Sequence, residues 1–136
     1  MPGENLVSSL LGGQIGTDDS DFVVVEWSDA GDSGYDWIAP LHVHHGDDEA
    51  WYVLEGTLRV RVGDQVHEVG PGGAVMAPKG VPHAYGNARR GERARYLLVM
   101  TPRVRALVQA LHSPAAGDYA AIFRAHDSEL LTSGQA

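Results

Sequence analysis

Short apolar runs broken by Gly, Pro and Asp fill residues 22–100. Runs of four to eight β-branched and apolar residues between turn formers are typical of β-strands. Many such strands in succession predict a mainly β protein, an antiparallel sandwich or barrel. The expected strands are Phe22–Trp27, Trp37–His45, Glu49–Leu54, Leu58–Val62, Gln65–Val69, Ala74–Ala77, Val81–Tyr85 and Arg93–Met100.

The clearest hairpin is predicted for residues 58–69. Apolar and charged residues alternate along Leu58–Val62, and Gly63-Asp64 suits a two-residue turn with Gly first. This turn places Arg59 opposite Glu68, an oppositely charged cross-strand pair.

The pattern changes to helical spacing after residue 100. Thr101 is a good N-cap, Pro102 suits the first helical position, and apolar residues follow at helical spacing to Leu111. Asp118 can cap a second helix, whose inner face we expect to reach Leu130.

The length of 136 residues suits one domain. We expect an irregular arm over 1–20 that docks on a sheet, a β-barrel over 21–100, two helices over 102–131 and a frayed end at 133–136.

Composition excludes several classes of function. The net charge of −8 argues against nucleic acid as a partner, since phosphate binding needs clustered Lys and Arg. Cysteine is absent, which removes disulfides and thiolate ligands and fits a reducing compartment. We expect no signal peptide and no membrane span, because the N-terminus lacks a basic region and no apolar run approaches about 20 residues. The sequence therefore predicts a cytoplasmic protein.

Charge is distributed unevenly along the chain. Residues 1–58 contain no Lys or Arg, so all ten basic residues lie after them. Packing of the two halves against each other, within one barrel or across a dimer, is favoured over a cation-binding tail, because blocks of one charge sign are absent.

Two imidazoles and a carboxylate follow each other closely at His42, His44 and Glu49. Residues i and i+2 of a strand share a face, so His42 and His44 point the same way if 41–45 is a strand. Gly46, Asp47 and Asp48 form a turn, after which Glu49 starts the next strand. Their convergence indicates a divalent-metal site.

A second stretch, Gly72 to Asn87, reads GGAVMAPKGVPHAYGN. Together the two stretches resemble the cupin family. The first is similar to cupin motif 1, H-x-H-x4-E-x6-G, filled by His42, His44, Glu49 and Gly56. The second is similar to motif 2, G-x5-P-x-G-x2-H-x3-N, filled by Gly72, Pro78, Gly80, His83 and Asn87. The resemblance covers residues 42–87, and both motifs occur in order at the family's spacing.

One departure from the family pattern stands before motif 1. Asp36 occupies the position where a glycine is usual, six residues before the first histidine, and we interpret the nearby Gly34 as marking a shifted loop.

The resemblance implies a small double-stranded β-helix, the jelly roll or cupin barrel. It implies one divalent transition metal per chain, bound by His42, His44, Glu49 and His83. Imidazole and carboxylate ligands suit Fe, Mn, Ni, Zn and Cu alike. We expect His45, His67, His112 and His126 to be surface or structural residues.

Strand alternation also suggests which residues surround the metal. Trp51 shares a face with Glu49, and Tyr85 and Asn87 share one with His83, so these three either line a cavity or pack in the core. Val53 and Met76 are expected in the core or the cavity wall.

Three functions are compatible with the resemblance. The first is a dioxygenase similar to the quercetinase-like small cupins, in which Glu49 acts as general base. The second is a non-oxidative isomerase, lyase or decarboxylase that uses the metal as a Lewis acid. The third is a non-catalytic module that binds a sugar or effector. The apolar and aromatic cavity positions favour a small aromatic or enolisable molecule.

We also expect a homodimer. Tyr52 and Leu54 fall on the strand face opposite Glu49, and a large apolar surface is seldom left open to water.

Overall fold

The computed structural model describes residues 5–32 and 37–131. The predicted loop at Gly34 and Asp36 and the predicted frayed end at 133–136 lie outside the described residues.

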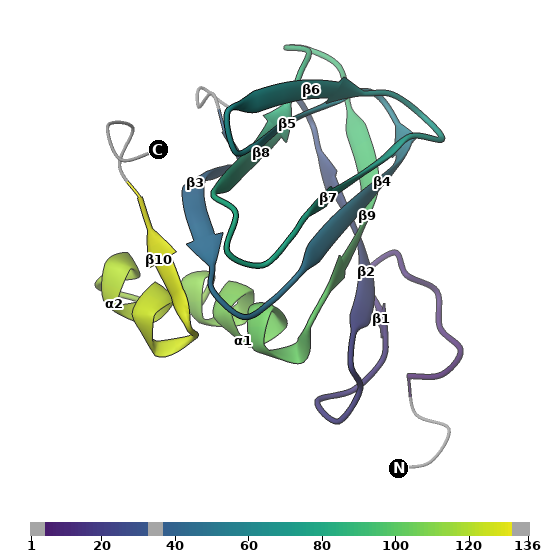
Figure 1. The fold of residues 1–136 in the computed structure, drawn as a ribbon. Coiled ribbons are helices and arrows are strands. Elements are labelled where there is room, and N and C mark those ends of the chain that lie inside the picture. The colour runs from purple at the N-terminus through teal and green to yellow at the C-terminus, as the bar shows by residue number, and fades with distance from the viewer. Residues whose placement is uncertain (1–4, 33–36, 132–136) are drawn as a thin grey trace.

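Two antiparallel sheets face each other across a common core (Figure 1). Sheet A has the order β1-β2-β9-β4-β7, and sheet B has the order β10-β3-β8-β5-β6. The strands of sheet A, in that order, are Gln14–Ile15, Val23–Asp29, Ala94–Met100, Glu49–Glu55 and Ala74–Ala77. Those of sheet B are Ser128–Leu130, Ala39–His44, His83–Asn87, Leu58–Val62 and Gln65–Val69. Consecutive strands alternate between the sheets from β2 to β5 and again from β6 to β10, as in the double-stranded β-helix that the sequence predicted.

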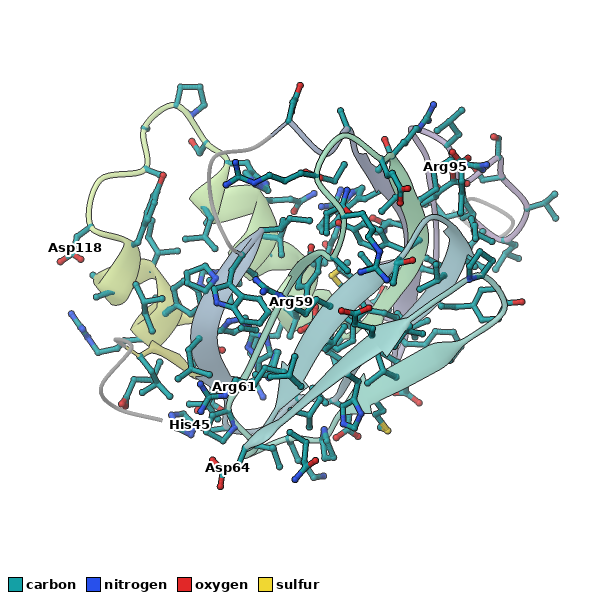
Figure 2. The ribbon with its side chains drawn as sticks, turned by 90° about the horizontal axis from the view of Figure 1, so that it is seen from above. His45, Arg59, Arg61, Asp64, Arg95 and Asp118 are labelled. Carbon is teal, nitrogen blue, oxygen red and sulfur yellow. The ribbon has the colours of Figure 1, made fainter. Side chains whose placement is uncertain are left out.

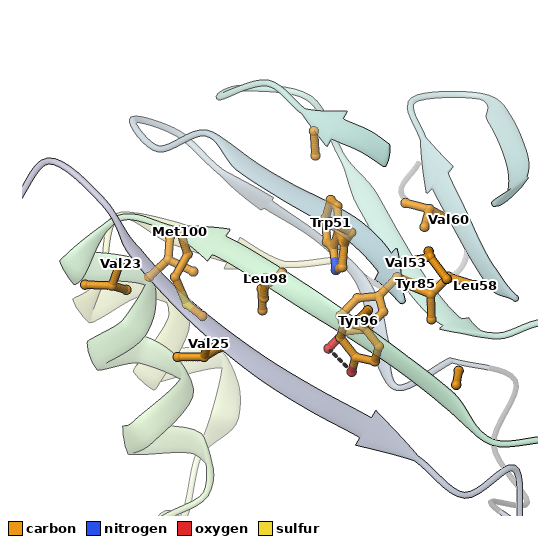
Figure 3. Packing of buried hydrophobic residues seen from close by; sticks show 13 residues of the cluster. Val23, Val25, Trp51, Val53, Leu58, Val60, Tyr85, Tyr96, Leu98 and Met100 are labelled. Carbon is orange, nitrogen blue, oxygen red and sulfur yellow. Dashed lines mark hydrogen bonds between the residues drawn. The ribbon is translucent and has the colours of Figure 1, made fainter. Parts of the chain in front are cut away.

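The core forms where the inner faces of the two sheets meet (Figure 3). Along β9, Ala94, Tyr96, Leu98 and Met100 are buried and alternate with partly exposed residues. Trp51 and Val53 of β4 lie beside them in the same sheet. Leu58 and Val60 of β5 pack against them from the other sheet. The alternation in the sequence therefore specifies which face of each strand is buried.

The hairpin of β5 and β6 has the predicted bounds and register. Gly63 has φ +59° in the turn, and Arg59 lies opposite Glu68. The Glu68 carboxylate pairs with Arg89 at 2.9 Å, and the Arg59 guanidinium lies 4.1 Å from the ring centroid of Trp37. Cross-strand register was thus predictable, whereas the contact of Glu68 with Arg89 depends on a neighbouring loop.

Two helices follow the last barrel strand. α1 spans Pro102–Leu111 with Thr101 as N-cap, and α2 spans Tyr119–Ala125 with Asp118 as N-cap. Both helices lie at one end of the barrel beside β3 and β10 (Figure 1). No helix among the described residues is long and apolar enough to cross a membrane.

The expected continuation of the second helix to residue 131 is wrong. The helix ends at Ala125, Asp127 has φ +54°, and Ser128–Leu130 forms β10. β10 pairs with β3, with Ser128 opposite His44 and Leu130 opposite His42. Pairing satisfies the backbone groups along the edge of β3 that a helix would have left unpaired.

The acidic first half and the basic second half are joined by ion pairs. Arg95 of β9 contacts Glu26 of β2 at 2.8 Å and Glu55 of β4 at 3.5 Å. Arg103 of α1 contacts Asp47 at 2.7 Å. Figure 2 shows Arg95 far from Asp118, the N-cap residue of α2. The charge asymmetry thus fits packing of the two halves within one barrel.

Candidate metal centre and its cavity

Four potential metal ligands converge inside the barrel from three strands. His42 and His44 lie on β3, Glu49 begins β4, and His83 begins β8 opposite His42. All four side chains are buried, and their ligand atoms lie within 4.8 Å of one another. Strand alternation and the β3–β8 register thus bring the four predicted residues together.

The spacing within this cluster fits one metal ion. Glu49 Oε1 is 3.1 Å from His44 Nε2 and 3.1 Å from His83 Nε2. Two ligands at right angles around an ion, with bonds of about 2.1 Å, lie about 3.0 Å apart. Three imidazoles and one carboxylate form a donor set for a divalent transition metal.

The Nδ1 atom of each imidazole forms a hydrogen bond to a group outside the cluster. His42 Nδ1 lies 2.6 Å from the carbonyl oxygen of Pro40, and His83 Nδ1 lies 3.0 Å from that of Val81. A carbonyl can only accept, so Nδ1 carries the proton in both rings. The Nε2 lone pair is then available to a metal at the centre of the cluster.

His44 is held by a side chain from the distant end of the chain. Its Nδ1 lies 2.7 Å from Ser128 Oγ, and that hydroxyl donates to the carbonyl of His126 at 3.1 Å. The single hydroxyl proton is used on the carbonyl, so Ser128 accepts from His44 Nδ1–H. Ser128 is 2% exposed. No motif points to Ser128, and the structure identifies it only because β10 pairs with β3.

Burial and mutual contacts shift the pKa values in the metal-free cluster. Burial, followed by repulsion from His83 and His44, lowers the pKa of His42 to about 3. Burial acts to raise the pKa of Glu49, but hydrogen bonds from His44 and His83 outweigh it and lower that pKa to about 2. At neutral pH, His42 is therefore neutral and Glu49 ionised, the states that metal ligation requires.

A cavity of about 840 Å³ opens from this cluster toward the helices. Three of the four ligands line it, namely His42, His44 and Glu49. The remaining wall is mostly apolar and aromatic, with Arg105, Gln109 and His112 among its few polar side chains. Its apolar and aromatic lining comprises Trp27, Ile38, Ala39, Pro40, Tyr85, Tyr96, Leu98, Val104, Leu107, Val108, Leu111, Tyr119, Phe123 and Leu130.

The residues predicted around the metal divide into three groups. Tyr85 lines the cavity, whereas Trp51 and Val53 are buried in the core. Met76 is 52% exposed, so its predicted place in the core or cavity wall is wrong: the β4–β7 register pairs Glu49 with Ala77 and Trp51 with Val75, which turns Met76 outward.

Asn87 has a structural role at the edge of the barrel. Its amide donates to Asp29 Oδ2 at 3.1 Å and to the carbonyl of Glu92 at 2.7 Å, and its side-chain oxygen accepts from the Arg89 N–H at 2.9 Å. It therefore joins β2, β8 and the turn before β9, outside the cavity lining.

The other histidines lie outside the cluster. His45 is exposed at the periphery (Figure 2), and His67 is exposed on β6. His126 donates from Nδ1 to the carbonyl of Ile122 at 2.8 Å. His112 was expected to be structural, but it lines the cavity. The apolar face of α1 was predictable, whereas its position over the barrel opening was not.

Comparison with known proteins agrees with this architecture. The family model described as "Cupin domain" matches residues 36–100. The cupin domain of Cnp3 from Schizosaccharomyces pombe is 13% identical over 77% of this chain and 70% of its own, with a TM-score of 0.55, and shows the fold alone. Residues 36–100 therefore form a small cupin domain.

Two similar structures carry functional names. The polyketide cyclase RemF from Streptomyces resistomycificus is 32% identical over 62% of this chain and 58% of its own, with a TM-score of 0.50. A sugar phosphate isomerase of the cupin superfamily from Silicibacter pomeroyi is 28% identical over 60% of this chain and 51% of its own, with a TM-score of 0.51. This chain thus spans little more than half of either protein. No curated protein matches it.

Proposed function

We propose that this protein is a metal-dependent enzyme that acts on a small, largely apolar molecule able to form an enolate. The observation that carries the proposal is the four-ligand cluster opening into an apolar cavity of about 840 Å³. Cavities of roughly 300–1,000 Å³ with a few convergent polar groups are typical of small-molecule sites. Two similar structures are named as a polyketide cyclase and a sugar phosphate isomerase, which supports an enzymatic role for the present chain.

The ligand set fits a divalent ion, which would supply Lewis-acid polarisation of a substrate oxygen. Glu49 lines the cavity and is ionised in the metal-free cluster, so its carboxylate could accept a proton from a substrate carbon if it leaves the metal. Phe123 and Leu98 contribute apolar walls that limit access of water to that proton. The imidazoles keep their orientation throughout, because their Nδ1–H groups stay hydrogen-bonded to the carbonyl oxygens of Pro40 and Val81 and to the Ser128 hydroxyl.

Glu49→Gln tests this role, because it keeps the size and one oxygen but removes the basicity. In metal-loaded protein the turnover of enolisable substrates should fall about 10²–10⁴-fold while ligand binding persists. Glu55→Gln, at the partly exposed end of the same strand, is the matched control and should retain activity. Full activity in metal-loaded Glu49→Gln would remove Glu49 from the mechanism.

A dioxygenase is the second candidate, favoured by the aromatic lining of the cavity. An enolate formed at the same site is a suitable partner for dioxygen, and an apolar cavity admits dioxygen more readily than water. Oxygen uptake during turnover identifies this reaction, and turnover without uptake identifies an isomerase, lyase, decarboxylase or cyclase. Ligand binding without any turnover identifies a sugar- or effector-binding module. Metal analysis of protein from its native host identifies the ion.

We further propose a homodimer. Tyr52 of β4 and Met76 of β7 are 42% and 52% exposed on the outer face of sheet A, which supports a second copy covering this face. Sedimentation should give about twice the chain mass of 14.6 kDa, and a monomer at micromolar concentration would contradict it.

A cytoplasmic location remains our proposal, supported by the absence of cysteine.

A further inference from the structure

Two tyrosine hydroxyls meet inside the barrel, beyond the metal ligands. Tyr85 of β8 and Tyr96 of β9 come from opposite sheets, and their hydroxyl oxygens lie 3.1 Å apart (Figure 3). Both residues are almost fully buried, and both line the cavity. The pair is therefore accessible to a molecule that occupies the cavity.

The hydrogen bond between them leaves one donor unused. Each phenol has one proton, and only one of the two protons can lie between the oxygens. Among the residues that the structure describes, neither hydroxyl has any other hydrogen-bond partner. Buried polar groups in proteins almost always have a partner, so the remaining proton indicates a ligand or a water.

A second unpartnered donor lies beside this pair. Trp51 Nε1–H is buried and has no acceptor within the described part of the chain. The Trp51 ring centroid is 5.3 Å from that of Tyr85 and 5.8 Å from that of His83. Tyr85 and His83 therefore pack against the same ring, which brings the tyrosine pair within a small molecule's length of the candidate metal ligands.

We propose that the Tyr85–Tyr96 pair is a second polar anchor of the cavity, which binds an acceptor oxygen of a ligand whose other oxygen lies at the metal centre. The apolar walls between the two anchors select a flat hydrocarbon body. The ligand class is thus an aromatic or conjugated molecule with two separated oxygens, such as a hydroxylated ketone or a polyphenol. This inference rests on the proposed function for the site and specifies its substrate class.

Naphthalenediols test the second anchor. Calorimetry on metal-loaded protein would compare 2-naphthol, which has one oxygen, with a panel of isomeric naphthalenediols. At least one diol should bind about tenfold tighter than 2-naphthol, as expected for one added hydrogen bond. The double variant Tyr85→Phe/Tyr96→Phe should lose this preference and still bind 2-naphthol.

The double variant is suited to this test because it removes both partners of one hydrogen bond and keeps the ring shapes, a change that is nearly neutral for folding. Tyr52→Phe, on the exposed outer face, is the matched control and should keep the preference. A wild type without any preference, or a preference that survives in the double variant, would overturn the inference, and so would failure of every probe to bind. Failure of the proposed function would differ, since diol binding would keep its dependence on the tyrosines while no substrate turned over.

Discussion

The barrel strands over 39–100 and the C-terminal segment over 102–131 build the same site in different ways. The strands supply all four candidate metal ligands, and two of the three imidazoles are held by carbonyls only two residues earlier in the chain. The C-terminal segment supplies no ligand atom. It supplies the Ser128 hydroxyl that holds His44 and much of the apolar wall of the cavity.

This difference shows that the identity of the candidate ligands and their orientation depend on different parts of the chain. Ligand identity follows from strand alternation and register, which are local properties of the sequence. Orientation of His44 follows from a contact between residues 84 positions apart. A site of this kind is recognisable from one segment but is completed by another.

The largest effect should come from loss of a ligand on the barrel strands. His83→Ala should lower metal affinity by more than about 100-fold, beyond the 10–100-fold typical of a lost outer partner. His45→Ala and His67→Ala are matched controls, because both residues are exposed outside the cluster. Metal content after dialysis against a weak chelator measures the effect. Similar losses in all three variants would refute the assignment of His83.

A smaller effect is expected from the C-terminal segment. Ser128→Ala removes the acceptor for His44 Nδ1–H, so metal affinity should fall about 10–100-fold although no ligand is lost. Glu129→Ala, on the exposed side of the same strand, is the control. Competition titrations with a metal indicator give the affinities. An unchanged affinity in Ser128→Ala would show that the barrel strands orient His44 without help.

The smallest expected effect is a loss of folding stability in acid, measured on the metal-free protein. The unfolded chain takes up a proton at His42 below about pH 6.5, but the folded protein resists it until about pH 3. The unfolded state therefore binds more protons in this window, and stability falls as pH falls through it. Glu49 acts in the same direction below about pH 4.5, since its folded pKa is about 2.

Between pH 6.5 and pH 5 the His42 contribution amounts to about 2 kcal/mol, because one proton is worth about 1.4 kcal/mol per pH unit. Urea unfolding in the presence of a chelator measures it, and the slope should flatten in His42→Gln. Equal stability of the wild type at both pH values would contradict the prediction and would mean that the cluster opens to water in the metal-free protein.

The fold was largely predictable because its signals are local. The alternation of apolar and charged residues predicted β5 and β6 with the turn between them. The N-cap residues Thr101 and Asp118 predicted where both helices start. β10 was not predictable, because Ser128–Leu130 carries no strand pattern of its own and becomes a strand by pairing with the edge of β3.

The clustering of the four candidate ligands was predictable from spacing, but the cavity was not. Its wall combines strand residues with α1 and α2, and the position of these helices depends on packing that no short motif records. Met76 shows how sensitive such predictions are, because a shift of one residue in register exchanges the two faces of a strand.

The apolar wall formed by α1 and α2 has a consequence for how such a protein can diversify. Leu107, Val108 and Phe123 line the cavity without contributing a ligand atom. Substitutions there can change which molecules fit while the reactive centre stays intact. Part of the selectivity is therefore encoded apart from the reactive centre, and a library confined to the two helices could search for new substrates without losing the metal.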